Sequence, residues 1–363
     1  MPNACSGKAA SRVSHHQPIE SGVISSQPRA YAADRVLIVG AGSWGTALAV
    51  QIARNQRSVV LWGHRAEHIE ALRQERRNRR YLPECAFPER LSLSADLKDA
   101  LRSVRDLILA VPSDGLRDTL QAIRGCEADV RVAWACKGIE AGTHLFPHQV
   151  VEQVLAPGRP MAVISGPTFA AEVAAGLPAA LAVAANDPGF ASDLAKRLHG
   201  GRLRAYTNDD IIGVEVGGAV KNVLAIAAGI ADGLGFGANT RAALITRGLA
   251  EMTRLGVQLG GRSETFIGLA GLGDLVLTCT DNQSRNRRLG LALAQGLSAE
   301  EGVRRIGQVV EGLRTAFEVD YLAHKHSMEM PIVAQVAQVL NGQCTPREAV
   351  QALLARAPKQ ELS

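Results

Sequence analysis

The chain has 363 residues, of which 47% are hydrophobic and 21% charged, and 40 Lys and Arg against 35 Asp and Glu give a formal net charge of +5. This length exceeds what one hydrophobic core usually serves, so two domains are expected. The composition excludes fibrous and largely disordered chains, and the mild positive charge is compatible with anionic small molecules without implying nucleic acid. The six cysteines include no CxxC pair, so neither a disulfide framework nor a zinc knuckle is expected.

The first 33 residues are rich in Ser, Gln, Pro and Ala and show almost no apolar periodicity. Residues 1–33 are therefore expected to form a disordered tail. An organelle-targeting peptide and a start codon placed too early are the alternative interpretations. No uninterrupted apolar run approaches the roughly 18 to 20 residues that a membrane-spanning helix needs. We expect a cytoplasmic protein without membrane insertion.

From Arg35 onward, short β-branched runs alternate with helical patterns, which indicates a mostly parallel sheet with crossover helices. Strands are expected at 35–40, 58–62, 106–111, 131–136, 161–165 and 179–185. The strand pattern stops near Tyr206, and apolar residues then recur at helical spacing as far as Ala357. The sequence thus predicts an α/β fold, with a Rossmann-like, mostly parallel sheet in residues 34–208 followed by an all-helical domain in residues 209–358.

The pattern GAGSWG at residues 40–45 lies between the first expected strand and a helix expected over Thr46 to Arg54. In this position GxGxxG is typical of dinucleotide binding. Gly40 permits the tight turn, Gly42 lets a pyrophosphate approach the backbone, and Gly45 lets helix and strand pack. An ordinary glycine-rich turn is the alternative.

The second expected strand ends in Trp62-Gly63-His64-Arg65, without the acid that would hold a ribose 2′-hydroxyl. The imidazole of His64 and the guanidinium of Arg65 could instead bind a 2′-phosphate, which favours NADPH and NADP over NADH and NAD. The alternative is that both residues merely open a solvated helix.

Two further strand ends carry candidate ligand-binding groups at the edge where doubly wound sheets bind ligands. Lys137 follows the apolar run at 131–136, and Gly166 and Thr168 follow the run at 161–165. A solvated lysine and a tight turn are the alternatives.

In the helical half, Lys221 is the single charge in an almost wholly small and apolar run at 217–224. Desolvation lowers the pKa of a buried ammonium group toward the range in which it can give and take protons. Lys221 is therefore a candidate acid–base group, and a lysine that extends out of an apolar helix is the alternative.

A glycine-rich segment at 268–275 surrounds one acid, Asp274, and is followed by Ser284, Arg285 and Asn286 within residues 281–288. Hydroxyl, amide and guanidinium groups at the start of a helix can bind a phosphate. A solvated basic face is the alternative.

Two other clusters favour no function. Five arginines lack interleaved aromatic residues and any nucleic-acid-binding signature, so no nucleic-acid partner is expected; they are Arg73, Arg76, Arg77, Arg79 and Arg80. The histidine pairs at 64 and 68 and at 324 and 326 have no supporting ligand set, so no metal is expected.

In their order, these motifs resemble the glycerol-3-phosphate dehydrogenase family, specifically its bacterial biosynthetic branch, which reduces dihydroxyacetone phosphate. The resemblance runs from about Val36 to Ala355. It rests on GAGSWGTALA, VPS at 111–113, KGIE, ISGPTFA, GGAVKNVLAI, GLGDLVLTCTDNQSRNRR and GQVVEG at 307–312.

The resemblance implies a role for individual residues, with Lys221 as proton donor and acceptor. It implies substrate contacts at Lys137, Gly166, Thr168, Asp274, Ser284, Arg285 and Asn286. Beside Gly40, Gly42, Gly45 and Arg65, it implies cofactor contacts at Ser43, Trp44, His64, Lys137, Ala170, Arg285, Val309 and Glu311.

The implied reaction is hydride transfer from the nicotinamide to the ketone carbon of this phosphorylated triose, giving sn-glycerol 3-phosphate for glycerophospholipid synthesis. A homodimer is one candidate assembly. A β-hydroxyacid or ketopantoate-type dehydrogenase is a rival without the phosphate-binding loop, and a non-catalytic NADP-binding regulator is a second. Two departures from the family pattern are Cys136, where threonine is usual, and Ala171, where lysine is frequent.

Overall fold

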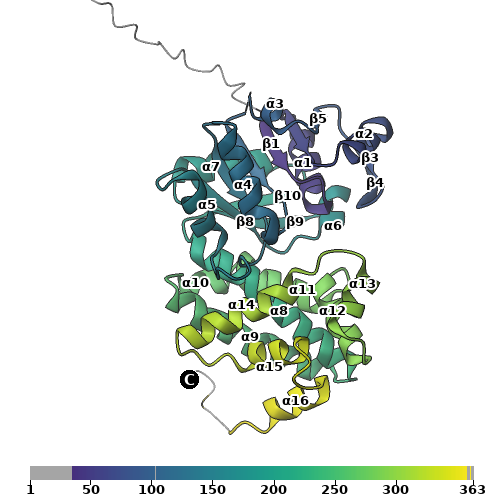
Figure 1. Ribbon diagram of the computed structural model, residues 1–363, viewed down its shortest axis with the longest axis vertical. Helices are drawn as coiled ribbons and strands as arrows, with labels where there is room; N and C mark the ends of the chain where they lie inside the picture. Colours follow the sequence, from purple (N-terminus) through teal and green to yellow (C-terminus); the bar gives the residue numbers. More distant parts are fainter. Residues whose placement is uncertain (1–34, 103, 358–359, 361–363) are drawn as a thin grey trace, which may run out of the picture. The chain divides into compact units, whose positions relative to one another are not determined.

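The computed structural model describes residues 35–102, 104–357 and 360, which belong to one compact unit (Figure 1). The tail predicted for residues 1–33 lies outside the described residues. Strands and helices alternate as far as Asn208, and the described elements from Ile211 onward are helices. The predicted fold class is therefore confirmed, while the division into domains at 208 and 209 stays a prediction.

Eight strands form one sheet in the order β10-β9-β8-β7-β6-β1-β2-β5. Every neighbouring pair is parallel except β8 and β9, which are antiparallel. The strands are β1 (Val36–Val39), β2 (Val59–Trp62), β5 (Leu91–Ser94), β6 (Asp106–Leu109), β7 (Arg131–Trp134), β8 (Met161–Ser165), β9 (Ala179–Ala185) and β10 (Leu203–Asn208). A separate antiparallel pair, β3 (Arg77–Asn78) with β4 (Leu82–Ala86), forms a short hairpin.

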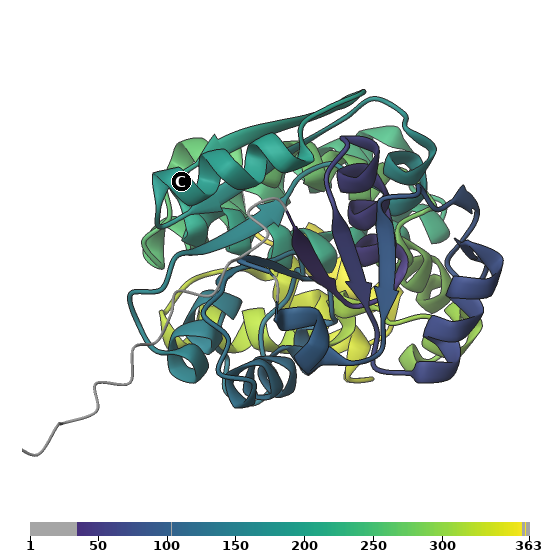
Figure 2. The ribbon, with the colours of Figure 1, turned by 90° about the horizontal axis from the view of Figure 1, so that it is seen from above.

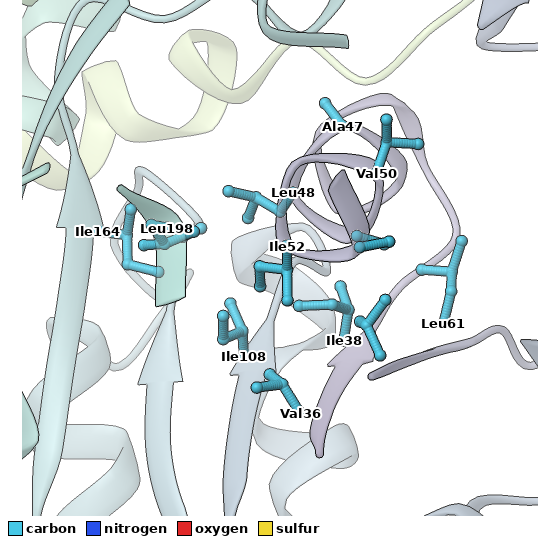
Figure 3. Packing of buried hydrophobic residues seen from close by; sticks show 14 of the residues in the cluster. Val36, Ile38, Ala47, Leu48, Val50, Ile52, Leu61, Ile108, Ile164 and Leu198 are labelled. Atoms are coloured by element: carbon cyan, nitrogen blue, oxygen red, sulfur yellow. The ribbon is translucent and has the colours of Figure 1, made fainter. Parts of the chain in front are cut away.

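Helices cover both faces of this sheet, because side chains alternate between the faces along each strand (Figure 2). On one face, Val36 and Ile38 pack with Leu48 and Ile52 of α1 (Figure 3). On the other, Leu37 and Val39 belong to a cluster with Trp134 and residues of α3, α4 and α5. The helices of this half are α1 (Ser43–Arg54), α2 (Ala66–Glu75), α3 (Leu97–Leu101), α4 (Leu116–Gly125), α5 (Pro147–Leu155), α6 (Ala170–Ala175) and α7 (Pro188–Leu198), with a short 3₁₀ turn at Ser113–Gly115.

The six strands expected from the sequence are all present, but two strands of the main sheet were not predicted. β5 and β10 are the edge strands, and about half or more of their residues are partly or fully exposed. The sequences LSLS and LRAYTN therefore lack the apolar run by which a strand buried on both faces is recognised. The β3–β4 hairpin was missed for the same reason.

A buried ion-pair network joins the amino-terminal ends of two central strands to a covering helix. Asp106, at the start of β6, is fully buried. Its carboxylate accepts two hydrogen bonds from Arg131 of β7, at 2.7 and 2.9 Å, and forms an ion pair with Arg197 of α7 at 2.8 Å. Ion pairs thus link the amino-terminal ends of β6 and β7 to α7.

The helical half is built around α8 (Ile211–Gly233), a 23-residue helix with buried side chains along nearly its whole length. The other α-helices of this half form one apolar cluster with it. They are α9 (Ala238–Gln258), α10 (Ser263–Phe266), α11 (Asp274–Thr280), α12 (Arg285–Ala294), α13 (Ala299–Ile306), α14 (Glu311–Lys325), α15 (Pro331–Leu340) and α16 (Pro346–Leu354). Ala270 of a π-helical turn, η2 (Leu269–Gly273), packs instead in a core of the sheet.

Among the described helices, α8 is the one that is long and apolar enough to cross a membrane, with a mean hydropathy of 1.6 over its most apolar stretch. This departs from the expectation that no segment reaches that length. The rest of the structure buries 94% of that stretch, so its apolar character belongs to the protein core.

Candidate active site

The glycine-rich loop after β1 leaves room for a ligand at the start of α1. Gly40 has φ +117°, and a Cβ there would lie 2.7 Å from the carbonyl oxygen of Ala110, so only glycine fits. A Cβ on Gly42 would meet no atom within 4 Å. Gly42 is also the N-cap of α1 and offers no capping side chain, so the first backbone N–H groups of α1 are available to an anion. The loop therefore fits a pyrophosphate.

This loop opens into a cavity of about 1200 Å³ that also reaches residues of α8, α11, α12 and the segment before α14. Of the predicted site residues, all but Gly45 and Gly166 line it: Gly40, Gly42, Ser43, Trp44, His64, Arg65, Lys137, Thr168, Ala170, Lys221, Asp274, Ser284, Arg285, Asn286, Val309 and Glu311. Gly45 packs behind the loop against the Gly40 carbonyl. The structure thus brings together residues that are far apart in the sequence.

At the centre, one carboxylate holds two lysines. Asp274, at the start of α11 and 1% exposed, accepts a hydrogen bond from Lys221 at 2.5 Å on one oxygen and from Lys137 at 2.6 Å on the other. Lys137 also donates to the carbonyl oxygen of Gly166 at 3.3 Å, and Lys221 to the hydroxyl of Thr278 at 3.0 Å. Both ammonium groups therefore have fixed positions, and neither lysine is the solvated side chain of the alternative interpretations.

Burial and charge act against each other on these groups. Burial would raise the pKa of the Asp274 carboxyl, but the ammonium groups of Lys137 and Lys221 outweigh burial and lower it below its ordinary value. Burial lowers the pKa of Lys221 to about 8, although the Asp274 carboxylate opposes that shift. Asp274 is accordingly ionised at neutral pH, and Lys221 can exchange a proton close to neutrality.

The segment predicted to bind a phosphate forms the first turn of α12. Ser284 is the N-cap, and its hydroxyl accepts from the backbone N–H of Arg287 at 3.2 Å. Ser284 and Asn286 are buried and line the cavity. The neighbouring Arg287 is also buried, but it forms an ion pair with Asp232 and does not line the cavity. The first turn of α12 therefore presents hydroxyl, amide and guanidinium groups to the cavity.

A relay of amides connects this turn to the lysines. Asn222 donates to the Lys137 carbonyl oxygen at 2.8 Å and accepts from Asn286 at 2.8 Å, while Asn286 accepts from the Gly312 backbone N–H at 2.9 Å. Asn222 was not predicted, although it follows Lys221 on the same helix. Thr278 was also missed; its position four residues after Asp274 places it on the same helix face.

One part of the cavity wall comes from a cluster for which the sequence predicts no function. In the arginine cluster at 73–80, Arg80 lines the cavity together with Tyr81, as do His64 and Arg65. The β3–β4 hairpin, which the sequence did not reveal, is what brings Arg80 there. Among the described residues, no group of three or more His, Cys, Asp or Glu side chains is placed to hold a metal ion.

Comparison with known proteins gives the same family in both halves of the chain. Residues 35–191 match the N-terminal region, and residues 210–351 the C-terminal region, of NAD-dependent glycerol-3-phosphate dehydrogenase. A protein of Yersinia pestis named glycerol-3-phosphate dehydrogenase (NAD(P)+) is 55% identical over 326 residues, covering 89% of this chain and 96% of that protein.

Solved structures agree. The crystal structure of glycerol-3-phosphate dehydrogenase from Coxiella burnetii has a TM-score of 0.86 at 51% identity, covering 89% of this chain and 99% of that one. A putative ketopantoate reductase from Ralstonia solanacearum, at 15% identity and a TM-score of 0.54, covers 88% of this chain and 99% of its own and shares the fold alone. Together with the paired lysines on Asp274, these matches show that the chain belongs to the NAD-dependent glycerol-3-phosphate dehydrogenase family.

Proposed function

We propose that this chain reduces dihydroxyacetone phosphate to sn-glycerol 3-phosphate with NADPH, or with NADH, and supplies glycerophospholipid synthesis. One observation carries the proposal: an acid–base lysine held by Asp274 shares a cavity with both a pyrophosphate-binding loop and a phosphate-binding helix start. Reduction of a phosphorylated ketone by a nicotinamide cofactor needs all three: a proton donor, a cofactor site and a site for the substrate phosphate.

Several residues of this chain would hold the cofactor. The N–H groups at the start of α1 and the open backbone at Gly42 suit its pyrophosphate, and His64 and Arg65 suit the adenosine end, where a 2′-phosphate favours NADPH. Ser43, Trp44, Ala170, Val309 and Glu311 line the rest of that part. The bound cofactor supplies the hydride.

Lys221 moves the proton. Its ammonium group donates a proton to the oxygen of the reduced carbonyl, and in the reverse reaction the neutral amine accepts it. When Lys221 is neutral, Asp274 still pairs with Lys137, so the carboxylate is never left as an unpartnered buried charge. Lys137 adds a second positive charge where the carbonyl oxygen gains negative charge.

The first turn of α12 orients the substrate. Ser284, Arg285 and Asn286 bind the phosphate, which does not react, and the binding energy positions the carbonyl carbon. Because the Asn286 amide is hydrogen-bonded to Asn222, which follows Lys221, the phosphate site and the proton donor share one rigid support. Thr168 lines the same cavity and completes the substrate site, while Gly166 lies behind it and holds Lys137 through its carbonyl oxygen.

The location, the partners and the oligomeric state of the enzyme are also open to proposal. We propose a cytoplasmic protein that acts on a small molecule and binds no nucleic acid. It does not insert into membranes, because the one long apolar helix among the described residues is buried. A homodimer stays a prediction, which light scattering of the purified chain tests.

Turnover tests the function directly. NADPH oxidation, followed by absorbance, is expected with dihydroxyacetone phosphate and is expected to be far slower with unphosphorylated dihydroxyacetone, which cannot use the first turn of α12. Ketopantoate and a β-ketoacid are the matched controls. Turnover with either control but not with dihydroxyacetone phosphate would overturn the proposal.

A further inference from the structure

The β3–β4 hairpin supplies a wall of the cavity that the proposed function leaves without a role. Arg80 and Tyr81, at its turn, line the cavity together with His64, Arg65 and His68. In a doubly wound sheet the end of the second strand, here β2, is where the adenosine ribose is recognised. The ring centroid of Tyr81 lies 6.1 Å from that of His68, in the first turn of α2, whose N-cap is Arg65. Arg80, which precedes Tyr81, therefore lies at the adenosine end.

The hairpin is anchored to the glycine-rich loop, so this wall is formed before a ligand arrives. Asn78, in β3, is fully buried. Its amide donates to the carbonyl oxygen of Ala41 at 3.2 Å and to the hydroxyl of Thr46 at 2.9 Å. One side chain thus fixes the turn relative to the loop that fits the pyrophosphate and to the start of α1.

Arg80 differs from the other arginines of the cluster in its partners. Arg73 pairs with Glu70 and Arg79 with Glu75 at 2.8 Å, whereas Arg76 and Arg77 donate to backbone carbonyl oxygens. Among the described residues Arg80 has no acidic partner, and its guanidinium carbon lies 5.3 Å from the centroid of the Tyr81 ring. An aromatic ring holds a guanidinium in place without neutralising its charge.

Arg65 also has no acidic partner among the residues that the structure describes. The acidic residues that line the cavity, Asp274, Asp281 and Glu311, all belong to the helical half. Two uncompensated guanidinium groups therefore line the adenosine end. A phosphate monoester carries up to two negative charges and accepts forked hydrogen bonds, whereas a ribose hydroxyl does neither.

We propose that Arg80 is a second guanidinium for the 2′-phosphate of NADPH, beside Arg65, and so determines cofactor specificity. This inference rests on the proposed use of a nicotinamide cofactor. It gives a function to one arginine of the cluster and leaves the others as surface residues.

Calorimetric titration of the full chain with NADPH and with NADH tests this assignment without turnover. Arg80→Gln is expected to weaken NADPH binding about 10- to 100-fold, the effect of one charge-assisted hydrogen bond, and to leave NADH binding nearly unchanged. The dependence of NADPH affinity on salt is expected to become shallower. Arg79→Gln, next in the chain but paired with Glu75 and outside the cavity, is the matched control and is expected to change neither affinity.

Equal weakening of NADPH and NADH by Arg80→Gln would overturn the assignment, as would no weakening of either. Arg80→Lys is a second variant that keeps the charge, and it is expected to retain more NADPH affinity than Arg80→Gln. Failure of the proposed reaction looks different, because a chain that does not reduce dihydroxyacetone phosphate can still lose NADPH affinity selectively in Arg80→Gln.

Discussion

Lys221 keeps a charge inside an apolar helix because Asp274 compensates it and Thr278 accepts a further hydrogen bond from it. Burial of an ammonium group without such partners would cost several kcal/mol and would favour the neutral amine. The balance leaves the pKa of Lys221 at about 8, which suits a group that must donate a proton in one direction and accept it in the other.

Replacing Lys221 by Met tests that role. Methionine keeps the helix and the approximate volume, and Asp274 keeps Lys137 as its partner, so Lys221→Met is expected to fold and to bind NADPH. Turnover of dihydroxyacetone phosphate is expected to fall by roughly 10²- to 10⁴-fold. Steady-state kinetics beside a thermal melt measures both effects. Near-normal turnover would show that Lys221 is not the donor and would make Lys137 the leading candidate.

The pH dependence of the rate follows from the same group. Reduction needs protonated Lys221, so kcat/KM for dihydroxyacetone phosphate is expected to fall as pH rises through about 8. Oxidation of glycerol 3-phosphate needs the neutral amine, so its kcat/KM is expected to rise through the same range. Profiles in both directions from about pH 6 to about pH 10 check the opposite signs. Parallel profiles would contradict the assignment.

Two charged residues of the candidate site could be predicted from the sequence because each stands alone in a small or apolar segment. These are Lys221 and Asp274, since a single charge among glycines and alanines needs an explanation. Asn222 and Thr278 carry no such signal, because their roles depend on which atoms face them after folding. Arg80 carries no such signal either, because four similar arginines precede it and only the β3–β4 hairpin brings it to the cavity.

Among the elements, the carboxyl ends and the amino-terminal ends of the parallel strands have different roles. Lys137, Gly166 and Thr168 follow the carboxyl ends of β7 and β8, where ligands bind. The buried Asp106 network joins the amino-terminal ends of β6 and β7 to α7. Substitutions at the carboxyl ends should therefore affect activity, and substitutions at the amino-terminal ends should affect stability.

The substitution Asp106→Asn is expected to affect stability without affecting turnover. It removes the buried carboxylate that Arg131 and Arg197 share, although Arg131 keeps its ion pair with Asp193 at 2.9 Å. It is expected to cost about 3–5 kcal/mol of unfolding free energy, measured by urea denaturation. At a temperature where the variant is folded, kcat is expected to stay near normal, because the site lies at the carboxyl ends of the strands. Asp99→Asn, which breaks an exposed pair with Arg102, is the control and is expected to cost less than about 1 kcal/mol. Equal losses in the two variants would refute the distinction.

At the same scale, the central strands could be predicted from their apolar runs, and the edge strands β5 and β10 could not. A strand with one neighbour and exposed side chains needs few apolar residues, so its sequence resembles that of a loop. The surrounding fold decides that these segments pair.

Across the whole molecule, α8 connects two apolar cores. Its first turn, with Ile211 and Val214, packs into one core of the sheet, whereas Val216 through Ile230 form the centre of the helical core. A rigid helix shared in this way couples the stability of the two halves. The described residues should therefore unfold together.

Two spectroscopic probes can test for a single transition. The three tryptophans, Trp44, Trp62 and Trp134, all belong to the sheet half, while far-UV circular dichroism reports mainly on the helices. The two urea curves are expected to coincide and to shift together when NADPH is added in excess. A separate midpoint for tryptophan fluorescence would show that the halves unfold independently.

The buried position of α8 also has a consequence during synthesis on the ribosome. The helices that cover it, α12 and α14, lie later in the chain, and at ~5–20 residues per second the segment from Gly233 to Lys325 takes on the order of 5 to 20 s to make. For that interval a 23-residue apolar helix lacks the cover of α12 and α14, although α9 and α11, which also pack on it, emerge before them. A nascent chain is therefore most exposed to aggregation, and most dependent on chaperones, in the seconds after α8 emerges.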